Sequence, residues 1–203
     1  MNIQIKISKN PISYIKAIKY MEKRVNDIKL GKGRDLLWIL EHPLTYTAGI
    51  RSNKNEILDK KIKVIKTNRG GKITLHDRGQ KIIYLVIDLN NKKKDIRKFI
   101  NFIEKSIIQF LNKYDITAKT DKNNIGIWVK NKKIAAIGLR LSKWITYHGC
   151  SINLNNNLNK YKKIIPCGLN NNKVTSLKNE TNNKIINVNK NLKEIFLFNI
   201  SSI

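Results

Sequence analysis

The clearest structural signal in the chain is the segment IIYLVIDLNNKKKDIRKFINFIEKSIIQFLNKY, residues 82–114. Its opening run, residues 82–89, is short and apolar, which is typical of a buried strand. Asp95 then provides a helix-capping side chain, and apolar residues follow at every third or fourth position, as on one face of a helix. These apolar residues are Ile96, Phe99, Ile100, Ile103, Ile107, Phe110, Leu111 and Tyr114. A buried strand followed by an amphipathic helix predicts a layered structure in which helices pack on a β-sheet.

Strands and helices alternate on both sides of this segment. Upstream, apolar residues at helical spacing predict a first helix that starts at Asn10-Pro11 and ends at Gly31. Further elements are predicted as strands at residues 35–40, 125–129, 133–141 and 145–154, of which the middle two form a hairpin, and as a terminal helix at residues 192–200. We therefore expect an α/β (α+β) fold, a mixed β-sheet packed with helices, in one domain that spans residues 1–203.

The chain is strongly basic, with 41 Lys and Arg residues against 14 Asp and Glu residues and a net charge of +27. Of the basic residues, 34 are Lys and 7 are Arg, and the lysines are scattered along the chain. Proteins that read bases and phosphates favour Arg, because its planar guanidinium binds two acceptors at once. Ile and Asn are also abundant, at 35 and 28 residues, whereas Ala occurs 5 times, which is the pattern of AT-rich codons. We therefore attribute much of the charge to base composition and expect no nucleic-acid function.

Membrane and metal functions are not expected either. No apolar run reaches the ~18 residues that a membrane helix needs, and residues 1–10 lack the apolar core of a secretory signal. The two cysteines, Cys150 and Cys167, give no disulfide framework, so we expect a cytoplasmic protein. The three histidines lie far apart in the sequence, and no spacing typical of metal ligands occurs, so we expect no metal site.

A glycine-rich stretch at residues 69–80, RGGKITLHDRGQ, stands out from the Lys-Ile-Asn background. Paired glycines let a ligand approach backbone N–H groups closely, and Arg69 and His76 add polar contacts. The stretch matches neither a P-loop nor a dinucleotide-binding fingerprint. It predicts a ligand-binding loop; the alternative is a glycine turn between two strands with His76 on the surface.

Two later stretches could also carry chemistry. Residues 132–138, KKIAAIG, hold two of the 5 alanines beside Lys133, and small side chains there leave room for a ligand or, alternatively, for tight strand packing. Residues 164–169, IIPCGL, place Cys167 between Pro and Gly, which suits a sharply presented nucleophile. The alternative for this thiol is a small buried hydrophobic residue, the common fate of a free cysteine. Cys150 lies within an apolar strand pattern and is predicted to belong to the core.

Together these stretches resemble the lipoyl(octanoyl) transferases, which are similar in fold to lipoate and biotin protein ligases. The match holds in order and spacing from about residue 14 to residue 177. The family pattern R-G-G-x-x-T-x-H is met by Arg69, Gly70, Gly71, Thr74 and His76, followed by Gly79 and Gln80. The pattern K-I-A-A-I-G, followed by H-G and an apolar strand that ends in Asn, is met by residues 133–138, His148, Gly149 and Asn153. The pattern P-C-G is met by Pro166, Cys167 and Gly168. A weaker match is E-H-P at residues 41–43, followed by Y-T-A-G at residues 46–49.

The resemblance implies an acyltransferase that moves an octanoyl group from acyl carrier protein to a lysine of a lipoyl domain, the first step of endogenous protein lipoylation. It implies that Cys167 carries the octanoyl group as a thioester intermediate and that Lys133 pairs with this thiol. Such enzymes use neither ATP nor a cofactor. The implied acceptors are the lipoyl domains of 2-oxoacid dehydrogenase complexes and the glycine cleavage H protein, and we expect the enzyme to be a monomer.

The resemblance also assigns residues to the acyl-binding site. It implies that the substrate is bound by Arg69, Gly70, Gly71, Lys72, Ile73, Thr74, Leu75, His76, Ala136, Ile137, Gly138, Gly149, Cys150 and Ser151. One departure is Asp77-Arg78, which stands where the family usually has Gly-Pro and is closer to the lipoate ligase pattern. The alternative function is therefore an ATP-dependent lipoate–protein ligase, which would tolerate replacement of Cys167.

Overall fold

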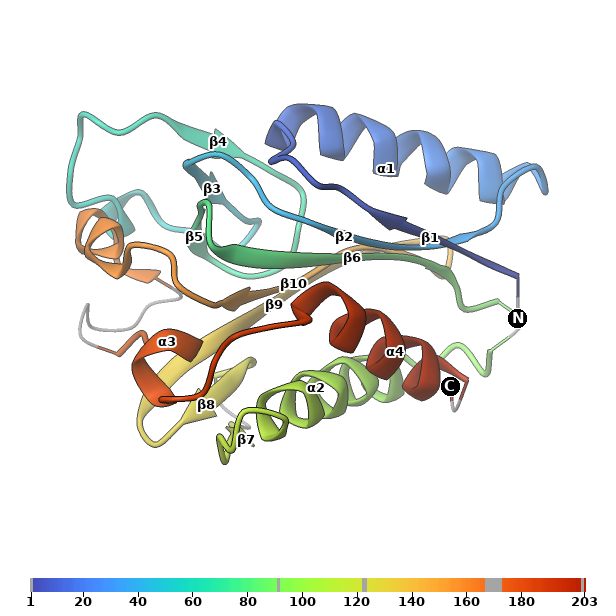
Figure 1. Cartoon of the computed structure of the whole chain (residues 1–203). Coiled ribbons are helices and arrows are strands. Elements are labelled where there is room, and N and C mark those ends of the chain that lie inside the picture. Colours follow the sequence, from blue (N-terminus) through green and yellow to red (C-terminus); the bar gives the residue numbers. More distant parts are fainter. Residues whose placement is uncertain (1, 91, 122–123, 167–172, 202) are drawn as a thin grey trace.

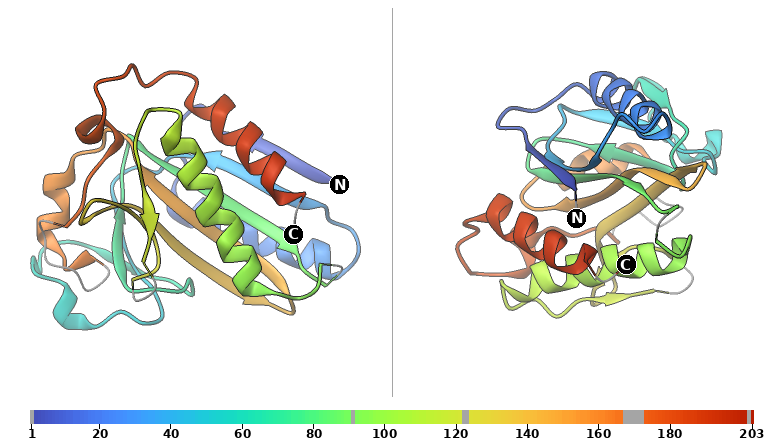
Figure 2. Two further views of the ribbon diagram at one scale, coloured as in Figure 1. Left: turned by 90° about the horizontal axis from the view of Figure 1, so that it is seen from below. Right: turned by 90° about the vertical axis from the view of Figure 1, so that its right-hand side faces the viewer.

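The computed structural model describes residues 2–90, 92–121, 124–166, 173–201 and 203. Within these residues, seven strands form one sheet with the order β1-β2-β6-β10-β9-β8-β7, and three strands form a smaller sheet with the order β4-β3-β5. Helix α1 covers one face of the large sheet, while α2 and α4 lie side by side on the other face (Figure 1 and Figure 2). The predicted fold class, a mixed β-sheet packed with helices, is confirmed.

The large sheet consists of β1 (Ile3–Ile7), β2 (Asp35–Leu40), β6 (Gln80–Asp88), β10 (Ile145–Asn153), β9 (Lys132–Ser142), β8 (Ile127–Val129) and β7 (Lys119–Thr120). The smaller sheet consists of β3 (Thr45–Ala48), β4 (Val64–Lys66) and β5 (Ile73–His76). The helices are α1 (Tyr14–Lys29), α2 (Ile96–Asn112), α3 (Leu177–Glu180) and α4 (Val188–Ile200), together with the short 3-10 helices η1 (Lys54–Glu56) and η2 (Leu158–Lys163). In the large sheet β1 runs parallel to β2, and the other neighbouring strands are antiparallel.

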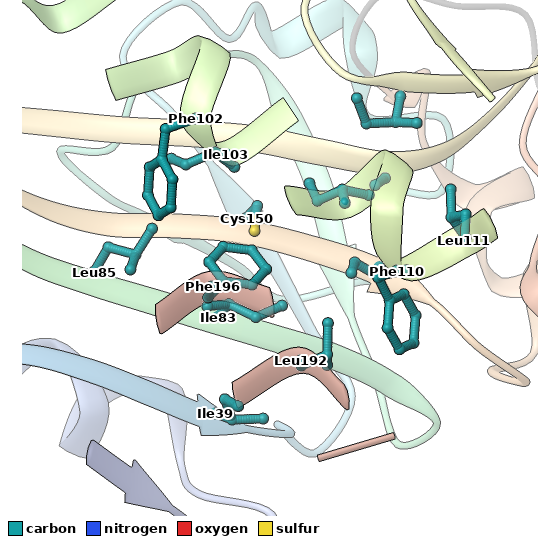
Figure 3. Close-up of a cluster of buried hydrophobic side chains, with 14 of the residues drawn as sticks. Ile39, Ile83, Leu85, Phe102, Ile103, Phe110, Leu111, Cys150, Leu192 and Phe196 are labelled. Atoms are coloured by element: carbon teal, nitrogen blue, oxygen red, sulfur yellow. The ribbon is translucent and has the colours of Figure 1, made fainter. Parts of the chain in front are cut away.

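Strand β2 shows why the predicted strands are continuous apolar runs. Its side chains alternate, so that Leu36, Trp38 and Leu40 pack on the α1 face and Leu37 and Ile39 pack on the face of α2 and α4. Since helices cover both faces, neither face of the strand requires polar residues. The core between the sheet and the helices α2 and α4 is drawn in Figure 3, with Ile39, Ile83, Phe102, Phe110, Cys150, Leu192 and Phe196 among its labelled members.

The longest predicted elements are confirmed. Asp95 caps α2, and its carboxylate accepts hydrogen bonds from two backbone N–H groups of the first helical turn. The predicted hairpin forms between β8 and β9, and its turn holds Lys130 in the left-handed region at a φ of 52°. The terminal helix is also present as α4, although it begins earlier, at Val188. None of the described helices is long and apolar enough to cross a membrane.

The predicted start of the first helix is wrong, because α1 begins at Tyr14 rather than at Asn10-Pro11. The backbone N–H of Ile12 donates to the carbonyl oxygen of Glu41 at 2.8 Å. This hydrogen bond holds the residues before the helix against the segment that follows β2. The helix therefore begins only after this contact, at Tyr14. Strands β1, β3, β4, β5 and β7 are absent from the prediction.

Strand β10 lies near the middle of the large sheet, between β6 and β9. It pairs with β9 without a break, but its pairing with β6 is interrupted at Tyr147 and His148. His148 has a φ of 62°, in the left-handed region that residues other than glycine rarely adopt. The rings of Tyr147 and His148 consequently stack, with centroids 4.9 Å apart, instead of pointing to opposite faces of the sheet. The change of direction brings the imidazole to the α1 face, beside Tyr84.

Candidate active site

Two of the stretches singled out in the sequence meet at a backbone hydrogen bond. The N–H of Gly70 donates to the carbonyl oxygen of Leu139 on β9 at 2.9 Å. A Cβ atom at position 70 would lie 2.9 Å from that oxygen, so this approach requires glycine. On β10, a Cβ atom at Gly149 would overlap the carbonyl oxygen of Ile83 on β6. The two glycines thereby allow the 69–76 stretch, β6, β9 and β10 to close around one pocket.

This main pocket is built from one helix end, the 69–76 stretch and three strands of the large sheet. It is lined by Tyr14, Arg69, Gly71, Lys72, Thr74, His76, Ile82, Tyr84, Ala136, Ile137, Gly138, His148, Gly149, Cys150 and Ser151. Two isoleucines, the small residues of β9 and the backbone of β10 give it apolar walls. Its ionisable side chains come mainly from the aromatic end near α1.

Arg69 is held inside the protein by carbonyl groups and a hydroxyl. Its Nη2 donates to the backbone oxygen and to the Oγ1 of Thr47, both at 2.8 Å, and its Nη1 donates to the carbonyl oxygen of Gly70 at 3.0 Å. The residue is 7% exposed. A buried guanidinium with several donors in use fixes the shape of the loop that it belongs to. Arg69 therefore ties the paired glycines to β3 of the smaller sheet.

A cluster of buried aromatic and imidazole rings closes one end of the pocket. His42 donates from Nδ1 to the carbonyl oxygen of Ile12, so its Nε2 accepts a hydrogen bond from the hydroxyl of Tyr84 at 2.7 Å. His76 stacks on Tyr14 with ring centroids 5.6 Å apart. Burial lowers the pKa of His42 to about 4, and burial together with the charges of its neighbours lowers the pKa of His76 well below its ordinary value. Both imidazoles are therefore neutral at physiological pH.

His148 completes this cluster from β10. Its Nε2 lies 2.8 Å from Oδ1 of Asn68, whose Nδ2 donates to the hydroxyl of Tyr147 at 2.9 Å. Since the amide oxygen is an acceptor, Nε2 of His148 carries the proton. Burial, with a smaller contribution from the charge of Arg69, lowers the pKa of His148 to about 3. The end of the pocket near α1 thus holds imidazole rings that carry no charge.

A second, smaller pocket adjoins the first. Thr74, Ala136 and Ser151 line both pockets, so the two share a wall. The other residues around the second pocket are Lys133, Ile134, Ala135, Asn153, Tyr161, Pro166 and Val174. Among the residues that line it, Lys133 is the one with a full charge, and Asn153 and Tyr161 add uncharged polar groups.

Lys133 is buried in this second pocket, with 7% of its surface exposed. Its ammonium donates to the carbonyl oxygen of Ile125 at 2.7 Å and lies 5.4 Å from the ring centroid of Trp128. Its backbone is fixed on the other side, where its N–H donates to the carbonyl oxygen of Lys173 at 2.7 Å and its own carbonyl accepts from the N–H of Thr175 at 2.9 Å. A buried ammonium held on one carbonyl keeps two further hydrogens for another partner.

Comparisons with known proteins agree with this geometry. The model of the lipoyl protein ligase A/B catalytic domain matches residues 13–196. The octanoyltransferase of Wolbachia sp. subsp. Brugia malayi (strain TRS) is 44% identical over 177 residues, which cover 85% of this chain and 86% of the relative. The octanoyltransferase of Bartonella bacilliformis (strain ATCC 35685 / KC583 / Herrer 020/F12,63) is 41% identical over 189 residues, which cover 86% and 78%. The chain belongs to the octanoyltransferases of the lipoyl protein ligase A/B family.

The fold of this octanoyltransferase is similar to that of a distant relative. The crystal structure of lipoate-protein ligase A bound with ATP superposes with a TM-score of 0.81, and the match covers 99% of this chain and 86% of that one at 16% identity. At this identity the likeness concerns the fold alone. The predicted relation in fold to lipoate protein ligases is confirmed.

The octanoyltransferase motif at residues 69–76 divides between the pocket and a core. Thr74 and His76 of β5 line the main pocket, whereas Ile73 and Leu75 pack on the opposite side, in the core of the smaller sheet. The division follows from the alternation of side chains along a strand. Gly70 lines a neighbouring groove instead of the main pocket. Ile73 and Leu75 therefore pack on the face of β5 that is turned away from the pocket.

The remaining predicted binding residues line the main pocket. They are Arg69, Gly71, Lys72, Thr74, His76, Ala136, Ile137, Gly138, Gly149, Cys150 and Ser151. The sulfur of Cys150 lies in the core beside Phe196 and Ile83, and burial raises the pKa of this thiol (Figure 3). Cys150 is therefore the core residue that the strand pattern predicts. The alternative that puts His76 on the surface is wrong, because His76 is 7% exposed.

The predicted nucleophile, Cys167, and the adjacent Gly168 lie outside the described residues. The neighbours of this interval are described. Pro166, to which Cys167 is bonded, lines the pocket of Lys133, and so does Val174 on the other side of the interval. The first residue of the P-C-G motif and a residue that follows the undescribed interval therefore both line the lysine pocket.

Four residues of the main pocket are absent from the prediction: Tyr14, Ile82, Tyr84 and His148. Tyr14 begins α1 and comes to the pocket through the packing of that helix, which no local pattern reveals. Ile82 and Tyr84 alternate on the α1 face of β6, within a run that is apolar on both faces. For His148 a signal was present, since the following glycine permits a close approach of the strand to β6.

Asp77, which departs from the usual octanoyltransferase pattern, has a structural partner. Its carboxylate is 2.6 Å from the ammonium of Lys160 on η2. Asp77 is 5% exposed, and Arg78 beside it is exposed to solvent. The departure therefore serves the contact between the β5–β6 turn and η2. Within the described residues, no cluster of three or more metal-ligating side chains occurs.

Proposed function

We propose that this octanoyltransferase moves an octanoyl group from acyl carrier protein to a lysine of a lipoyl domain through a thioester on Cys167, with Lys133 as the proton acceptor. The observation that carries the proposal is the shared pocket of Lys133 and Pro166, which adjoins the pocket assigned to the acyl chain. The membership in the octanoyltransferase family supports the same conclusion.

The main pocket suits an uncharged acyl chain. Ile82 and Ile137 offer apolar surface, and Gly138 and Gly149 let the chain lie close to the backbone. Each buried methylene contributes about 0.8 kcal/mol, so a chain of about eight carbons gains most of its affinity from this contact. The histidines that line the pocket are neutral, because burial lowers their pKa values, so they add no charge beside the acyl chain.

The first half-reaction forms the acyl-enzyme. The ammonium of Lys133 beside the Cys167 thiol favours the thiolate, which is the reactive form. The thiolate attacks the carbonyl carbon of the donor thioester, a new C–S bond forms to Cys167, and the C–S bond to the carrier breaks. The carrier thiolate takes a proton from the ammonium of Lys133 and leaves as a thiol, which leaves Lys133 as a neutral amine. One thioester replaces another, so the step is nearly even in energy.

The second half-reaction delivers the octanoyl group to the acceptor. Once Cys167 is acylated, its negative charge is gone, and Lys133 loses the partner that favoured its ammonium form. The neutral amine can then take the proton that the attacking lysine of the lipoyl domain releases. An amide bond forms, the C–S bond to Cys167 breaks, and the thiolate pairs again with the ammonium. Conversion of a thioester to an amide is downhill, so no ATP is required.

The proposed partners are both acidic proteins, the acyl carrier protein and the lipoyl domains of 2-oxoacid dehydrogenase complexes or of the glycine cleavage H protein. A net charge of +27 would attract them over a distance and speed their encounter with the active site. We propose that the enzyme acts in the cytoplasm as a monomer.

The proposal is tested by supplying the two candidate acyl sources separately. In one reaction the protein receives octanoyl-carrier protein and a lipoyl domain without ATP; in the other it receives free octanoate, ATP and the same lipoyl domain. We expect the lipoyl domain to gain one octanoyl group in the first reaction and to stay unmodified in the second, as read by intact mass. Modification that occurs only with ATP would favour the alternative, a lipoate–protein ligase.

A further inference from the structure

Three polar side chains that the proposed chemistry does not use form a buried network beside the lysine pocket. Gln80, Asn153 and Tyr161 are 0%, 4% and 5% exposed. Nε2 of Gln80 donates to Oδ1 of Asn153 at 2.9 Å and to the hydroxyl of Tyr161 at 3.0 Å. The hydroxyl of Tyr161 in turn donates to Oδ1 of Asn153 at 3.3 Å. The network connects the start of β6, the end of β10 and η2.

The orientation of each amide in the network is fixed by backbone groups. Nδ2 of Asn153 donates to the carbonyl oxygen of Thr175 at 2.9 Å, so its Oδ1 must face Gln80 and Tyr161. Nε2 of Gln80 also lies 3.3 Å from the carbonyl oxygen of Leu75, so Oε1 of Gln80 must point the other way. If either amide were turned over, two acceptors or two donors would face each other inside the protein, and the folded state would lose free energy of stabilisation.

This orientation decides the tautomer of His76. Oε1 of Gln80 lies 2.9 Å from Nδ1 of His76. Because an amide oxygen can only accept, Nδ1 carries the proton, and since burial lowers the pKa of His76, the Nε2 of its neutral ring is an acceptor. His76 lines the main pocket, so the network sets the polarity of one of that pocket's walls.

The network also holds both described flanks of the P-C-G motif. Asn153 and Tyr161 line the same pocket as Lys133 and Pro166. Tyr161 belongs to η2, which precedes Pro166, and Thr175, which Asn153 contacts, follows Val174. Thr175 is bonded to the backbone of Lys133 in addition. One buried network thus fixes the chain before the motif, the chain after it and the strand that carries the lysine.

We propose that Gln80, Asn153 and Tyr161 are positioning residues for acyl transfer, which hold the flanks of the nucleophile motif against Lys133 and set the tautomer of His76. The inference rests on the proposed function, because it assumes that Cys167 and Lys133 react together. A displacement of about 1 Å between reacting groups can cost about 100-fold in rate, although no contact to the substrate is lost. A network that acted only on stability would leave the rate of the folded enzyme unchanged.

The test compares two variants of the network with two matched variants elsewhere. Tyr161→Phe and Asn153→Ala remove network groups. Tyr114→Phe removes a buried hydroxyl that donates to Ile186, and Asn199→Ala removes a buried amide that bonds to Ser106; both lie on the α2 and α4 side of the sheet. For each variant one measures the rate of acyl-enzyme formation against donor concentration, and the pH dependence of Cys167 alkylation by iodoacetamide, with peptide mass mapping to separate it from Cys150.

The network variants are expected to acylate about 10- to 100-fold more slowly at saturating donor, with the half-saturating donor concentration changed less than about 2-fold. The midpoint pH of alkylation is expected to rise toward that of an ordinary thiol, because the ammonium no longer meets the sulfur well. The matched variants are expected to keep both quantities. Wild-type rates and midpoints in folded Tyr161→Phe and Asn153→Ala would overturn the inference.

Two further outcomes keep the test decisive. If Asn153→Ala does not fold, Tyr161→Phe decides, because it removes a single oxygen atom. In the wild-type protein, long-range proton–nitrogen NMR should find the proton of the His76 ring on Nδ1, and a ring protonated on Nε2 would contradict the network. A wild-type protein that forms no acyl-enzyme would instead count against the proposed function, and the inference would fall with it.

Discussion

The main pocket and the lysine pocket share three residues, yet they are built in opposite ways. The main pocket is closed by glycine contacts and by histidines that burial keeps neutral. The lysine pocket encloses an ammonium that bonds to a backbone carbonyl, next to a network of amides and a phenol. On the proposed mechanism, binding and chemistry are separated: the main pocket would hold the apolar chain by its shape, and the lysine pocket would supply the proton acceptor.

The largest effect is expected at the lysine. Lys133→Met keeps most of the side-chain length and removes the charge, so the proton acceptor and the partner of the thiol are both lost. Octanoyl transfer should fall by about 10²- to 10⁴-fold, the usual contribution of a general base. The matched control is Lys132→Met, since Lys132 is the exposed neighbour on the same strand. Steady-state transfer assays check this, and comparable losses in the two variants would remove the distinction between the pockets.

The main pocket should be most sensitive to added volume at Gly149, where β10 approaches β6 closely. In Gly149→Ala, the new Cβ overlaps the carbonyl oxygen of Ile83, so β10 must move away from β6. We expect the free energy of unfolding to fall by about 3 kcal/mol, the upper range for overpacking. Gly31→Ala is the control without a packing clash, because nothing lies within 4 Å of the added Cβ; its backbone, unlike that of Gly149, is left-handed, with a φ of 69°, which should cost about 1 kcal/mol. Urea unfolding at neutral pH measures both, and equal losses would contradict the close packing.

The neutral histidines predict how stability depends on pH. The pKa of His148 is about 3 in the folded protein and 6.5 in an unconstrained chain, so the unfolded state takes up more protons below about pH 6.5. The contribution is therefore complete above pH 6.5 and is lost as the pH falls toward 3, at about 1.4 kcal/mol per pH unit. His148→Asn, which suits the left-handed backbone and does not titrate, should reduce this slope by that amount. Unfolding curves at pH 7 and 5.5 test it, and an unchanged slope would show that His148 titrates normally.

The smallest effect is expected at the residue that departs from the family pattern. Asp77 bonds to Lys160 and does not line either pocket. Asp77→Asn should lower the free energy of unfolding by about 1 kcal/mol, as for a partly exposed ion pair, and should leave the donor requirement unchanged. Variant and wild type would be compared with octanoyl-carrier protein and with octanoate plus ATP. A change in the acyl source used would give Asp77 a role in substrate choice.

The sequence predicted those parts of the fold whose pattern is repeated over many residues. Helix α2 repeats its apolar face over several turns, and the β8–β9 hairpin has two apolar arms around a polar turn. Strand β1 alternates Ile3, Ile5 and Ile7, a signal that was present but short. The strands β3 and β4 are too brief for any period to show, and they form only because the smaller sheet packs on η2 and the glycine stretch.

Site residues that belong to sequence motifs could be predicted, whereas residues that reach the pocket only through the packing of strands and helices could not. The motif residues on the 69–76 stretch, β9 and β10 come together because two glycines allow strands to approach. Tyr84 reaches the pocket through the register of β6, which no local pattern shows; His148 belongs to the H-G motif, but its left-handed turn of β10 is visible only in the structure. The tautomer of His76 depends on a network that spans β6, β10 and η2, which no single motif contains.

The most direct test of the central claim is the intact mass of the protein after incubation with octanoyl-carrier protein in the absence of ATP and acceptor. We expect the wild type to gain one octanoyl group, Cys150→Ala to gain the same, since that sulfur lies in the core, and Cys167→Ser to gain none. A mass gain that persists in Cys167→Ser, or full transfer to a lipoyl domain by that variant, would contradict the thioester mechanism.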